Sequence, residues 1–397
     1  MQAASLRGNV EAIRLLLDKG ADVNLQGGEY GSALQAAMYM GDIEVIRLLL
    51  DKGADVNTQN GEYGTALHAV IYMGNLEVIR LLLDKGADVN TQNGEYGSAF
   101  QAAIYRGDIE VIRLLLDKGA DVNLQGGEYG SALQAASYRG NVEVVRLLLD
   151  KGADVNIQGG KYALQAASCR GNVEVVRLLL DKGANVNTQG GKYGSALQAA
   201  SWGGNVEVVR LLLDTGAHVN TQSGEYGSAL QGASWGGNAE IVQLLLDKGA
   251  NVNIQGGEYG NALQAASWKG TIEVIRLLLD KGAEVYAQGG KFGTALQAAL
   301  APGLTHDLKP KELTDIFPIV ELLLDCGAES ATYISDSEYG NALTAAILPW
   351  KDSCVFDAFI KLLTSRGWGV GGGVESDKTE AWSHKAVTKQ KHGVRAT

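Results

Sequence analysis

Leucine triplets closed by an aspartate recur along the chain and set its pattern of apolar and polar positions. The closing aspartates are Asp18, Asp51, Asp84, Asp117, Asp150, Asp181, Asp214, Asp247, Asp280 and Asp325. Most of them lie 33 residues after the one before, so the chain is a tandem array of one unit. A period of that length predicts a β-turn with two antiparallel helices per unit, stacked into a solenoid that offers an elongated surface.

The unit at residues 129–161 shows which elements the pattern predicts. Small residues after Ser131 predict a short first helix that approaches its neighbours closely and ends at Gly140. Asn141 is the predicted N-cap of a second helix, whose apolar residues recur at i, i+3 and i+4 and predict a buried stripe. That stripe consists of Val142, Val144, Val145, Leu148 and Leu149. Gly152 predicts a left-handed C-cap, and residues 153–162 predict the hairpin that leads onward.

The fold class that follows is an all-α solenoid of about eleven helix-turn-helix units joined by β-hairpin loops. The array spans residues 1–366, with a truncated first unit at 1–29 and a degenerate last unit at 339–366, and residues 367–397 are predicted to be a disordered tail. The complete units begin at Tyr30, Tyr63, Tyr96, Tyr129, Tyr162, Tyr193, Tyr226, Tyr259, Phe292 and Tyr339. Because the first unit lacks its hairpin, the sequence leaves open whether the chain is a fragment of a longer multidomain protein.

Two interruptions of the repeat carry predictions of their own. At Tyr162-Ala163 a Gly-Ser pair present in other units is missing, which removes a capping hydroxyl and predicts a local bend or weak stacking. Between Leu300 and Ile319 the connection is longer than its counterparts, with an insertion at 301–314. Inserted loops in repeat arrays are often functional, but a neutral insertion in a degenerating part of the array explains this one equally well.

The opening of each first helix resembles the ankyrin-repeat signature. The family's Thr-Pro-Leu-His stands here as Ser-Ala-Leu-Gln, for example at Ser32-Ala33-Leu34-Gln35, and the histidine is retained only at His68. Together with the Gly-Gly-Glu-Tyr-Gly hairpin, this variant is similar to the ankyrin arrays of filamentous fungi, which are often attached to a nucleotide-binding domain in nonself-recognition receptors. The resemblance implies noncovalent recognition of a protein partner through the concave face and the hairpin tips.

In so regular an array, the positions that differ between units are the candidates for recognition. The position two before the glycine that ends the first helix reads Tyr39, Tyr72, Tyr105, Tyr138, Cys169, Trp202, Trp235 and Trp268. The next position reads Met40, Met73, Arg106, Arg139, Arg170, Gly203, Gly236 and Lys269. Tyr, Trp and Arg dominate interface energetics, so we predict a protein-binding surface. We call it the ladder; it comprises Tyr39, Tyr72, Tyr105, Tyr138, Trp202, Trp235, Trp268, Arg106, Arg139 and Arg170.

Other interpretations of these positions remain open. The ladder aromatics can simply stack on one another along the solenoid, and the array can be a structural scaffold or spacer with no concave-face ligand. The hairpin tips carry Glu29, Glu62, Glu95, Glu128, Glu225 and Glu258 and Lys161, Lys192 and Lys291. These charges form a solvated rim or favour a partner of mixed charge. A third reading, an adaptor that presents clients to a modifying enzyme, has no recruitment motif to support it.

Composition and charge narrow the functional class further. The formal net charge is −11, which argues against nucleic acid as a partner. No apolar run reaches the roughly 20 residues of a membrane span, and residues 1–17 do not form a signal peptide. The three cysteines fall at unrelated places in the repeat, so we expect a reducing compartment: the cytoplasm, with the nucleus as the alternative. We expect the chain to be a monomer.

Three apparent chemical motifs lack residues that the corresponding sites require. Gly190-Gly191-Lys192 resembles part of a phosphate loop, but Tyr193 stands where Ser or Thr should bind magnesium. The spacing from Asp18 to Glu29 resembles a calcium loop, yet Gly20 stands at a ligand position. The five histidines lack metal-ligand spacing. Since almost every polar residue is copied in each unit, we expect no enzyme activity, no cofactor and no metal.

Overall fold

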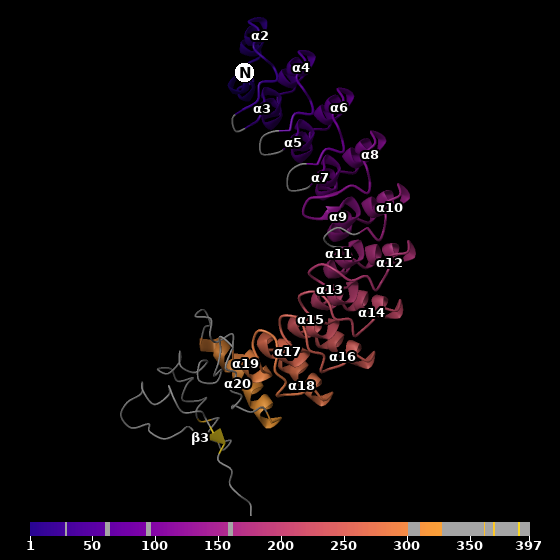
Figure 1. Ribbon diagram of the computed structural model, residues 1–397, viewed down its shortest axis with the longest axis vertical. Helices are drawn as coiled ribbons and strands as arrows, with labels where there is room; N and C mark the ends of the chain where they lie inside the picture. The colour runs from indigo at the N-terminus through magenta and orange to yellow at the C-terminus, as the bar shows by residue number, and fades with distance from the viewer. Residues whose placement is uncertain are drawn as a thin grey trace, which may run out of the picture. The chain divides into compact units, whose positions relative to one another are not determined.

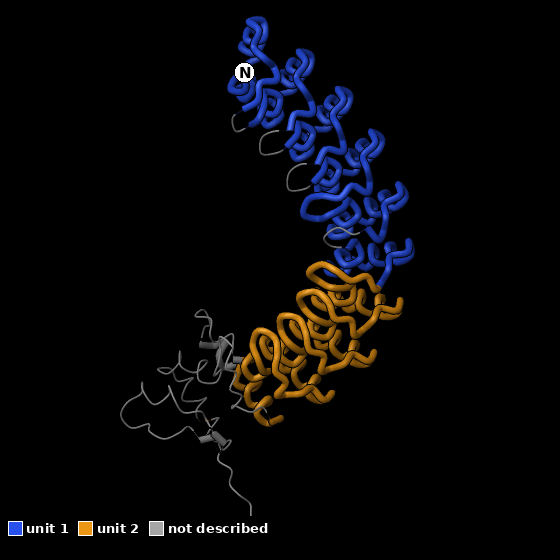
Figure 2. The backbone as a smooth tube through the Cα atoms, in the orientation of Figure 1, with its two compact units in different colours: residues 1–186 blue, residues 187–397 orange. Residues whose placement is uncertain are grey.

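The computed structural model describes residues 1–27, 30–59, 64–92, 97–157, 162–300 and 310–327, together with residue 361 and the pairs 368–369 and 388–389. The chain divides into two compact units, unit 1 at residues 1–186 and unit 2 at residues 187–397 (Figure 2). Each unit is described by itself.

Unit 1 is built from six helix pairs and one short hairpin (Figure 1). Its helices are α1 (Gln2–Leu6), α2 (Val10–Asp18), α3 (Ala33–Met40), α4 (Ile43–Asp51), α5 (Ala66–Met73), α6 (Leu76–Asp84), α7 (Ala99–Arg106), α8 (Ile109–Asp117), α9 (Ala132–Arg139), α10 (Val142–Asp150), α11 (Ala163–Arg170) and α12 (Val173–Asp181). Strands β1 (Gln125–Gly126) and β2 (Gly130–Ser131) pair antiparallel.

Unit 2 contains four helix pairs in its described part. They are α13 (Ala196–Trp202), α14 (Val206–Asp214), α15 (Ala229–Gly236), α16 (Ala239–Asp247), α17 (Ala262–Lys269), α18 (Ile272–Asp280), α19 (Ala295–Leu300) and α20 (Pro310–Asp325). Strands β3 (Trp368–Gly369) and β4 (Thr388–Lys389) form a second antiparallel pair. The described residues therefore hold ten helix pairs, and the predicted eleventh unit at 339–366 lies outside them except for residue 361.

Local capping explains where the helices begin and end. At the start of α9, the Ser131 hydroxyl accepts the Gln134 N–H at 3.3 Å, while Gln134 Oε1 accepts the Ser131 N–H at 2.8 Å. The helix ends at Gly140, whose φ of 73° is left-handed. Asn141 then caps α10 by accepting the Val144 N–H at 3.2 Å. The predicted N-cap and helix stop are both confirmed.

The helices form two layers within each unit, which Figure 1 shows as an inner and an outer row. First helices such as α9 are buried from Ala132 to Ser137, because small side chains let neighbours approach on both sides. Second helices are amphipathic: in α10, Val144, Val145 and Leu148 are buried. The predicted stripe was too wide, since Val142 and Leu149 are only half-buried. In each unit the buried core therefore lies between the two layers of helices.

A ladder of asparagine side chains links successive repeats. Asn57 Nδ2 donates to the Gly86 carbonyl at 3.1 Å, and Asn57 Oδ1 accepts the Asp88 N–H at 2.8 Å. The same pair of bonds recurs through Asn90, Asn123 and Asn156 in unit 1 and Asn187, Asn220 and Asn253 in unit 2. One side chain thus satisfies two backbone groups of the next repeat, which fixes the stacking register.

In unit 2 the hairpins themselves are hydrogen-bonded from one repeat to the next. The N–H groups of Glu225, Glu258 and Lys291 donate to the carbonyls of Lys192, Glu225 and Glu258 at 2.8–2.9 Å. This requires close approach: a Cβ at Gly257, where φ is +65°, would lie 2.5 Å from the Gly227 nitrogen. The second glycine of the hairpin's Gly-Gly pair is therefore a requirement of stacking as well as of the turn.

The two interruptions behave differently from the prediction. Tyr162 provides no side-chain cap to α11, as expected, but α11 packs alongside α9 and the asparagine ladder continues from Asn156 to Gly183 at 3.1 Å. Of the predicted local bend or weak stacking, weak stacking is not seen between α9 and α11, and the bend stays a prediction. The insertion at 301–314 is helical from Pro310, the first residue of α20, and its earlier part lies outside the described residues. In the predicted tail, the four described residues are those of β3 and β4.

Candidate protein-binding surface

The ladder positions lie at the ends of the first helices, and in most of these helices a buried glutamine is hydrogen-bonded to the next hairpin. Gln101 Nε2 donates to the Gly130 carbonyl at 3.0 Å, and Gln198 Nε2 donates to the Ser223 carbonyl at 2.7 Å and to the Gly227 carbonyl at 2.5 Å. This glutamine is the residue that replaces the histidine of the Thr-Pro-Leu-His signature. It fixes the hairpin beside the helix, and with it the residues that surround the ladder.

In unit 2 the ladder tryptophans stack face to face. The ring centroids of Trp202 and Trp235 lie 5.8 Å apart with 16° between the planes, and those of Trp235 and Trp268 lie 6.1 Å apart with 11°. All three side chains are half-buried. Stacking therefore accounts for part of their role, and each side chain remains partly exposed.

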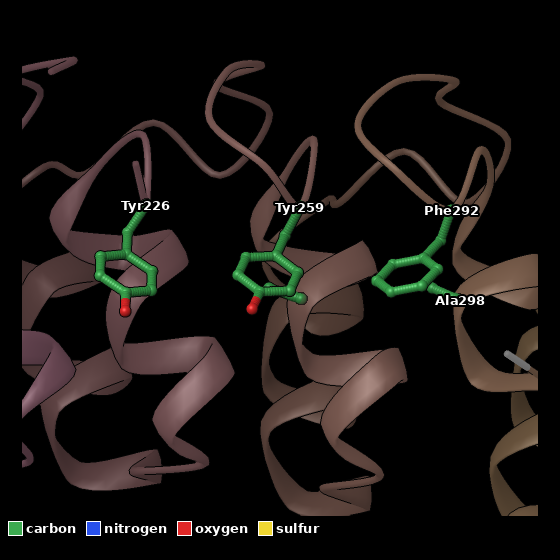
Figure 3. Close-up of a cluster of buried hydrophobic side chains, with 5 residues drawn as sticks. Tyr226, Tyr259, Phe292 and Ala298 are labelled. Carbon is green, nitrogen blue, oxygen red and sulfur yellow. The ribbon is translucent and has the colours of Figure 1, made fainter. Parts of the chain in front are cut away.

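A second aromatic row, which the sequence analysis did not assign to the surface, lies beside the tryptophans. It comes from the hairpins and consists of Tyr193, Tyr226, Tyr259 and Phe292. Figure 3 shows Tyr226, Tyr259 and Phe292 following one another in register, with centroids 6.3–6.5 Å apart. Each tryptophan lies against hairpin rings: Trp235, for example, is 6.1 Å from Tyr226 and 6.0 Å from Tyr259. The same repeat period in the sequence carries this row, so its periodicity was a signal for it.

In unit 1 the ladder is made of tyrosines, and the first two of them, Tyr39 and Tyr72, are more exposed than the tryptophans of unit 2. Tyr129 of the hairpin lies 5.6 Å from both Tyr105 and Tyr138, which repeats the two-row arrangement. Tyr39 and Tyr72 are 44% and 50% exposed, and Met40 and Met73 beside them are 54% and 37% exposed. Cys169 is buried and interrupts the aromatic register. The Tyr/Arg part of the ladder thus lies within unit 1 and the Trp/Gly part within unit 2.

The ladder arginines lie over the tyrosine of the preceding repeat. The guanidinium carbons of Arg139 and Arg170 are each 4.9 Å from the ring centroids of Tyr105 and Tyr138, respectively. Arg106 donates to the backbone carbonyl of Tyr72. The structure therefore brings two of the predicted arginines, Arg139 and Arg170, into cation–π contact with predicted tyrosines, and all three arginine side chains are exposed.

A family model described as ankyrin repeats, in three copies, matches residues 1–93, 92–159, 157–223 and 197–289, well over half of the 397 residues. The chain belongs to the ankyrin-repeat family. Ankyrin repeats generally mediate protein–protein interaction, and proteins built from them are typically non-enzymatic binding modules. No curated protein matches the chain.

Some of the charged side chains at the hairpin tips of this ankyrin array form ion pairs. In unit 2, Lys192 Nζ lies 3.3 Å from Glu225, and Lys291 Nζ lies 3.6 Å from Glu258. The hydrogen bond to Glu225 raises the pKa of Lys192. Glu29, Glu62, Glu95 and Lys161 lie outside the described residues. The described rim charges of unit 2 thus link neighbouring hairpins. Because these ion pairs are exposed, they contribute little to the free energy of unfolding.

Burial keeps two hairpin phenols of the ankyrin array neutral. It raises the pKa of Tyr129 to about 12, with a smaller contribution from Glu128, and raises the pKa of Tyr259 to about 12, with a contribution from Glu258. Both hydroxyls therefore remain hydrogen-bond donors even at a pH of about 10, where an ordinary tyrosine begins to lose its proton.

Membrane spans and metal sites are both absent from the described residues. No helix in the described ranges is long and apolar enough to cross a membrane. In the same ranges, no three or more His, Cys, Asp or Glu side chains are grouped so that they could hold a metal ion.

Proposed function

We propose that this ankyrin array recognises a protein partner through the ladder. One observation carries the proposal: the residue type along the register changes from exposed Tyr/Met through Tyr/Arg to Trp/Gly, while the helices that carry it stay nearly constant. Only α13 is one residue shorter than the others, and only α11 lacks the side-chain N-cap. Packing between identical units would favour one residue type throughout, whereas recognition of an asymmetric partner favours variation. Unit 1 supplies the most exposed part of this surface.

The experiment is an affinity capture from lysate of the source cell with the intact chain and a variant in which Tyr105, Tyr138, Trp202 and Trp235 are changed to alanine. We expect a prey protein that the intact chain retains and the variant loses at least about tenfold, since buried aromatic anchors contribute about 2 kcal/mol or more each. Circular dichroism of both proteins comes first. Tyr286→Ala is the matched control, because Tyr286 is 66% exposed and lies off the ladder.

If the variant with four alanine substitutions unfolds, a milder variant still tests the proposal. Tyr39 and Tyr72 are about half exposed, so changing both to alanine removes little packing. Loss of the prey with this pair supports the ladder. Equal capture by the intact chain and every folded ladder variant would instead favour the structural scaffold, a reading that the stacked tryptophans of unit 2 support on their own.

We also propose a finer assignment: a ligand-sensing part of a larger receptor of the fungal, nucleotide-binding type, acting in the cytoplasm, with the nucleus as the alternative. It is supported by the Ser-Ala-Leu-Gln opening and the Gly-Gly-Glu-Tyr-Gly hairpin. Sequencing the genomic region upstream tests it: an in-frame nucleotide-binding domain is the expected result, and an unrelated neighbouring gene refutes it. Imaging a fluorescent fusion in the source cell tests the compartment.

A further inference from the structure

The repeated cations of unit 1 fall into three sets, and among the described residues one set has no member with a carboxylate partner, whereas most members of the other two sets have one. Second-helix arginines pair with a glutamate of the next repeat; for example, Arg47 lies 2.7 Å from Glu77. Lysines that follow the second helix pair with an aspartate of the preceding repeat, as Lys85 does with Asp51 at 3.0 Å. The third set is Arg106, Arg139 and Arg170, which we call the arginine row. Among the described residues, these three have no ion pair.

Two members of the arginine row are held in place by aromatic contacts, and Arg106 donates a hydrogen bond to the Tyr72 carbonyl. Arg139 and Arg170 lie 4.9 Å from the ring centroids below them. A guanidinium that lies over a ring uses its flat face, so its N–H edge stays available for a carboxylate, which it can bind through two parallel hydrogen bonds. Because the ring already restricts the side chain, less rotamer entropy is lost when a ligand binds.

A purely structural role does not explain the row. Arginine in the last turn favours the negative end of a helix dipole, and the three arginines are the last residues of α7, α9 and α11. However, α3 and α5 end at Met40 and Met73 with the same left-handed glycine after them. The helix end therefore forms without a cation, and the arginines supply something that the fold does not need.

From this arrangement we infer that the arginine row binds an extended acidic segment of the protein partner, an inference that rests on the proposed function. Packed helices lie about 8–10 Å apart. An extended chain advances about 3.3 Å per residue, so one acidic side chain at every third residue would match the arginines of successive repeats. The chain as a whole is acidic, with a net charge of −11, and would repel such a segment from other registers.

Single-stranded nucleic acid is the competing ligand, because arginines beside aromatic rings also suit phosphates and stacked bases. The overall negative charge opposes it, and three cations release few counterions. An acidic peptide needs only those three contacts. Nucleic acid is therefore included in the test as an outcome that would overturn the inference.

The test measures fluorescence anisotropy of a labelled peptide with glutamate at every third position and Gly-Ser between, titrated with the full chain. The variant changes Arg106, Arg139 and Arg170 to glutamine. The matched control changes Arg47, Arg80 and Arg113 to glutamine, which removes the same formal charge from the second-helix layer. Circular dichroism confirms that each protein is folded, and a peptide with glutamine for glutamate controls for charge.

We expect the intact chain and the control variant to bind within about twofold of each other, and the arginine-row variant to bind at least about tenfold more weakly. Salt should weaken the binding, since exposed charges are screened. The inference is overturned if the row variant binds the peptide as well as the intact chain does, or if the intact chain does not bind it at low salt. It is also overturned if oligothymidylate binds more tightly than the peptide and depends on the row.

The failure of this inference can be told apart from the failure of the proposed function. If lysate prey is lost on ladder substitution while the acidic peptide does not bind the intact chain, the recognition surface stands and the acidic chemistry is wrong. If the peptide binds through the row while every ladder variant retains the prey, the anion-binding row stands and the ladder is not where the prey binds.

Discussion

His68 is the residue at which this array departs from its own pattern, and the departure predicts a pH dependence. Its Nδ1 lies 2.8 Å from Thr65 Oγ1, and burial lowers the pKa of His68, partly opposed by the Gly97 backbone. The unfolded chain, with an ordinary histidine pKa near about 6.5, therefore binds the proton more readily than the folded chain. The stabilisation is fully present above that pH and is lost as the pH falls below it.

The test replaces His68 with glutamine, the residue of the equivalent positions. Gln101 there reaches the Gly130 carbonyl at 3.0 Å, so glutamine at 68 is expected to reach Gly97. Urea unfolding measures the free energy of unfolding at pH about 7.5 and about 5.5, on either side of the ordinary histidine pKa. Between these two pH values, the free energy of unfolding of the intact chain should fall by up to about 1.4 kcal/mol per pH unit more than that of H68Q. His218→Gln, at an exposed histidine, is the control and should behave as the intact chain. Equal losses in H68Q and the intact chain would contradict the argument.

At the scale of elements, the asparagine ladder ends at one substitution. Tyr286 stands where Asn253 and its counterparts donate to the glycine carbonyl of the next repeat, and it is 66% exposed. Gly327, the acceptor that Tyr286 cannot reach in this way, keeps the same left-handed conformation with φ of 96°. We expect Tyr286→Asn to restore the bond and raise the free energy of unfolding by about 1 kcal/mol.

Chemical denaturation measures this gain, and Asn253→Ala provides the opposite change. That variant removes both the bond to the Gly282 carbonyl and the bond from the Glu284 N–H, so it should lower stability by about 1–2 kcal/mol. A neutral or destabilising effect of Tyr286→Asn would show that α20 does not stack as the earlier second helices do.

Elements governed by local rules were predictable, and those governed by packing between repeats were not. The cap at Asn141 and the stop at Gly140 follow from residue types within one turn. Tyr226 and Tyr259 of the hairpin row are buried by ladder residues of neighbouring repeats. The sequence of a single repeat therefore does not reveal their burial. The helix from Pro310 was missed because the insertion was read as a loop, although proline favours a first helical position.

At the scale of the whole molecule, stability rests on buried contacts between neighbouring repeats. The ion pairs that follow the repeat period are exposed, as at Arg47 and Glu77, where 53% and 59% of the side chains are accessible, so they contribute little. The buried alanine-rich helices and the stacked aromatics contribute more. Free energy in such an array is approximately a sum of unit and neighbour terms, so a substitution acts first on the repeats around it.

Trp235 offers the sharpest test of that locality, because it stacks on both Trp202 and Trp268 and touches two hairpin tyrosines. Trp235→Ala should cost about 2–3 kcal/mol, less than a fully buried tryptophan would, because the side chain is half-buried. Native-state hydrogen exchange should show the loss of protection concentrated in α13–α18, with α3–α8 little changed. Tyr72→Ala, at a half-exposed ladder position, should change protection much less. A uniform loss along the chain after Trp235→Ala would instead mean that the array opens as one cooperative body, and the sum over neighbouring repeats would then be the wrong description of its stability.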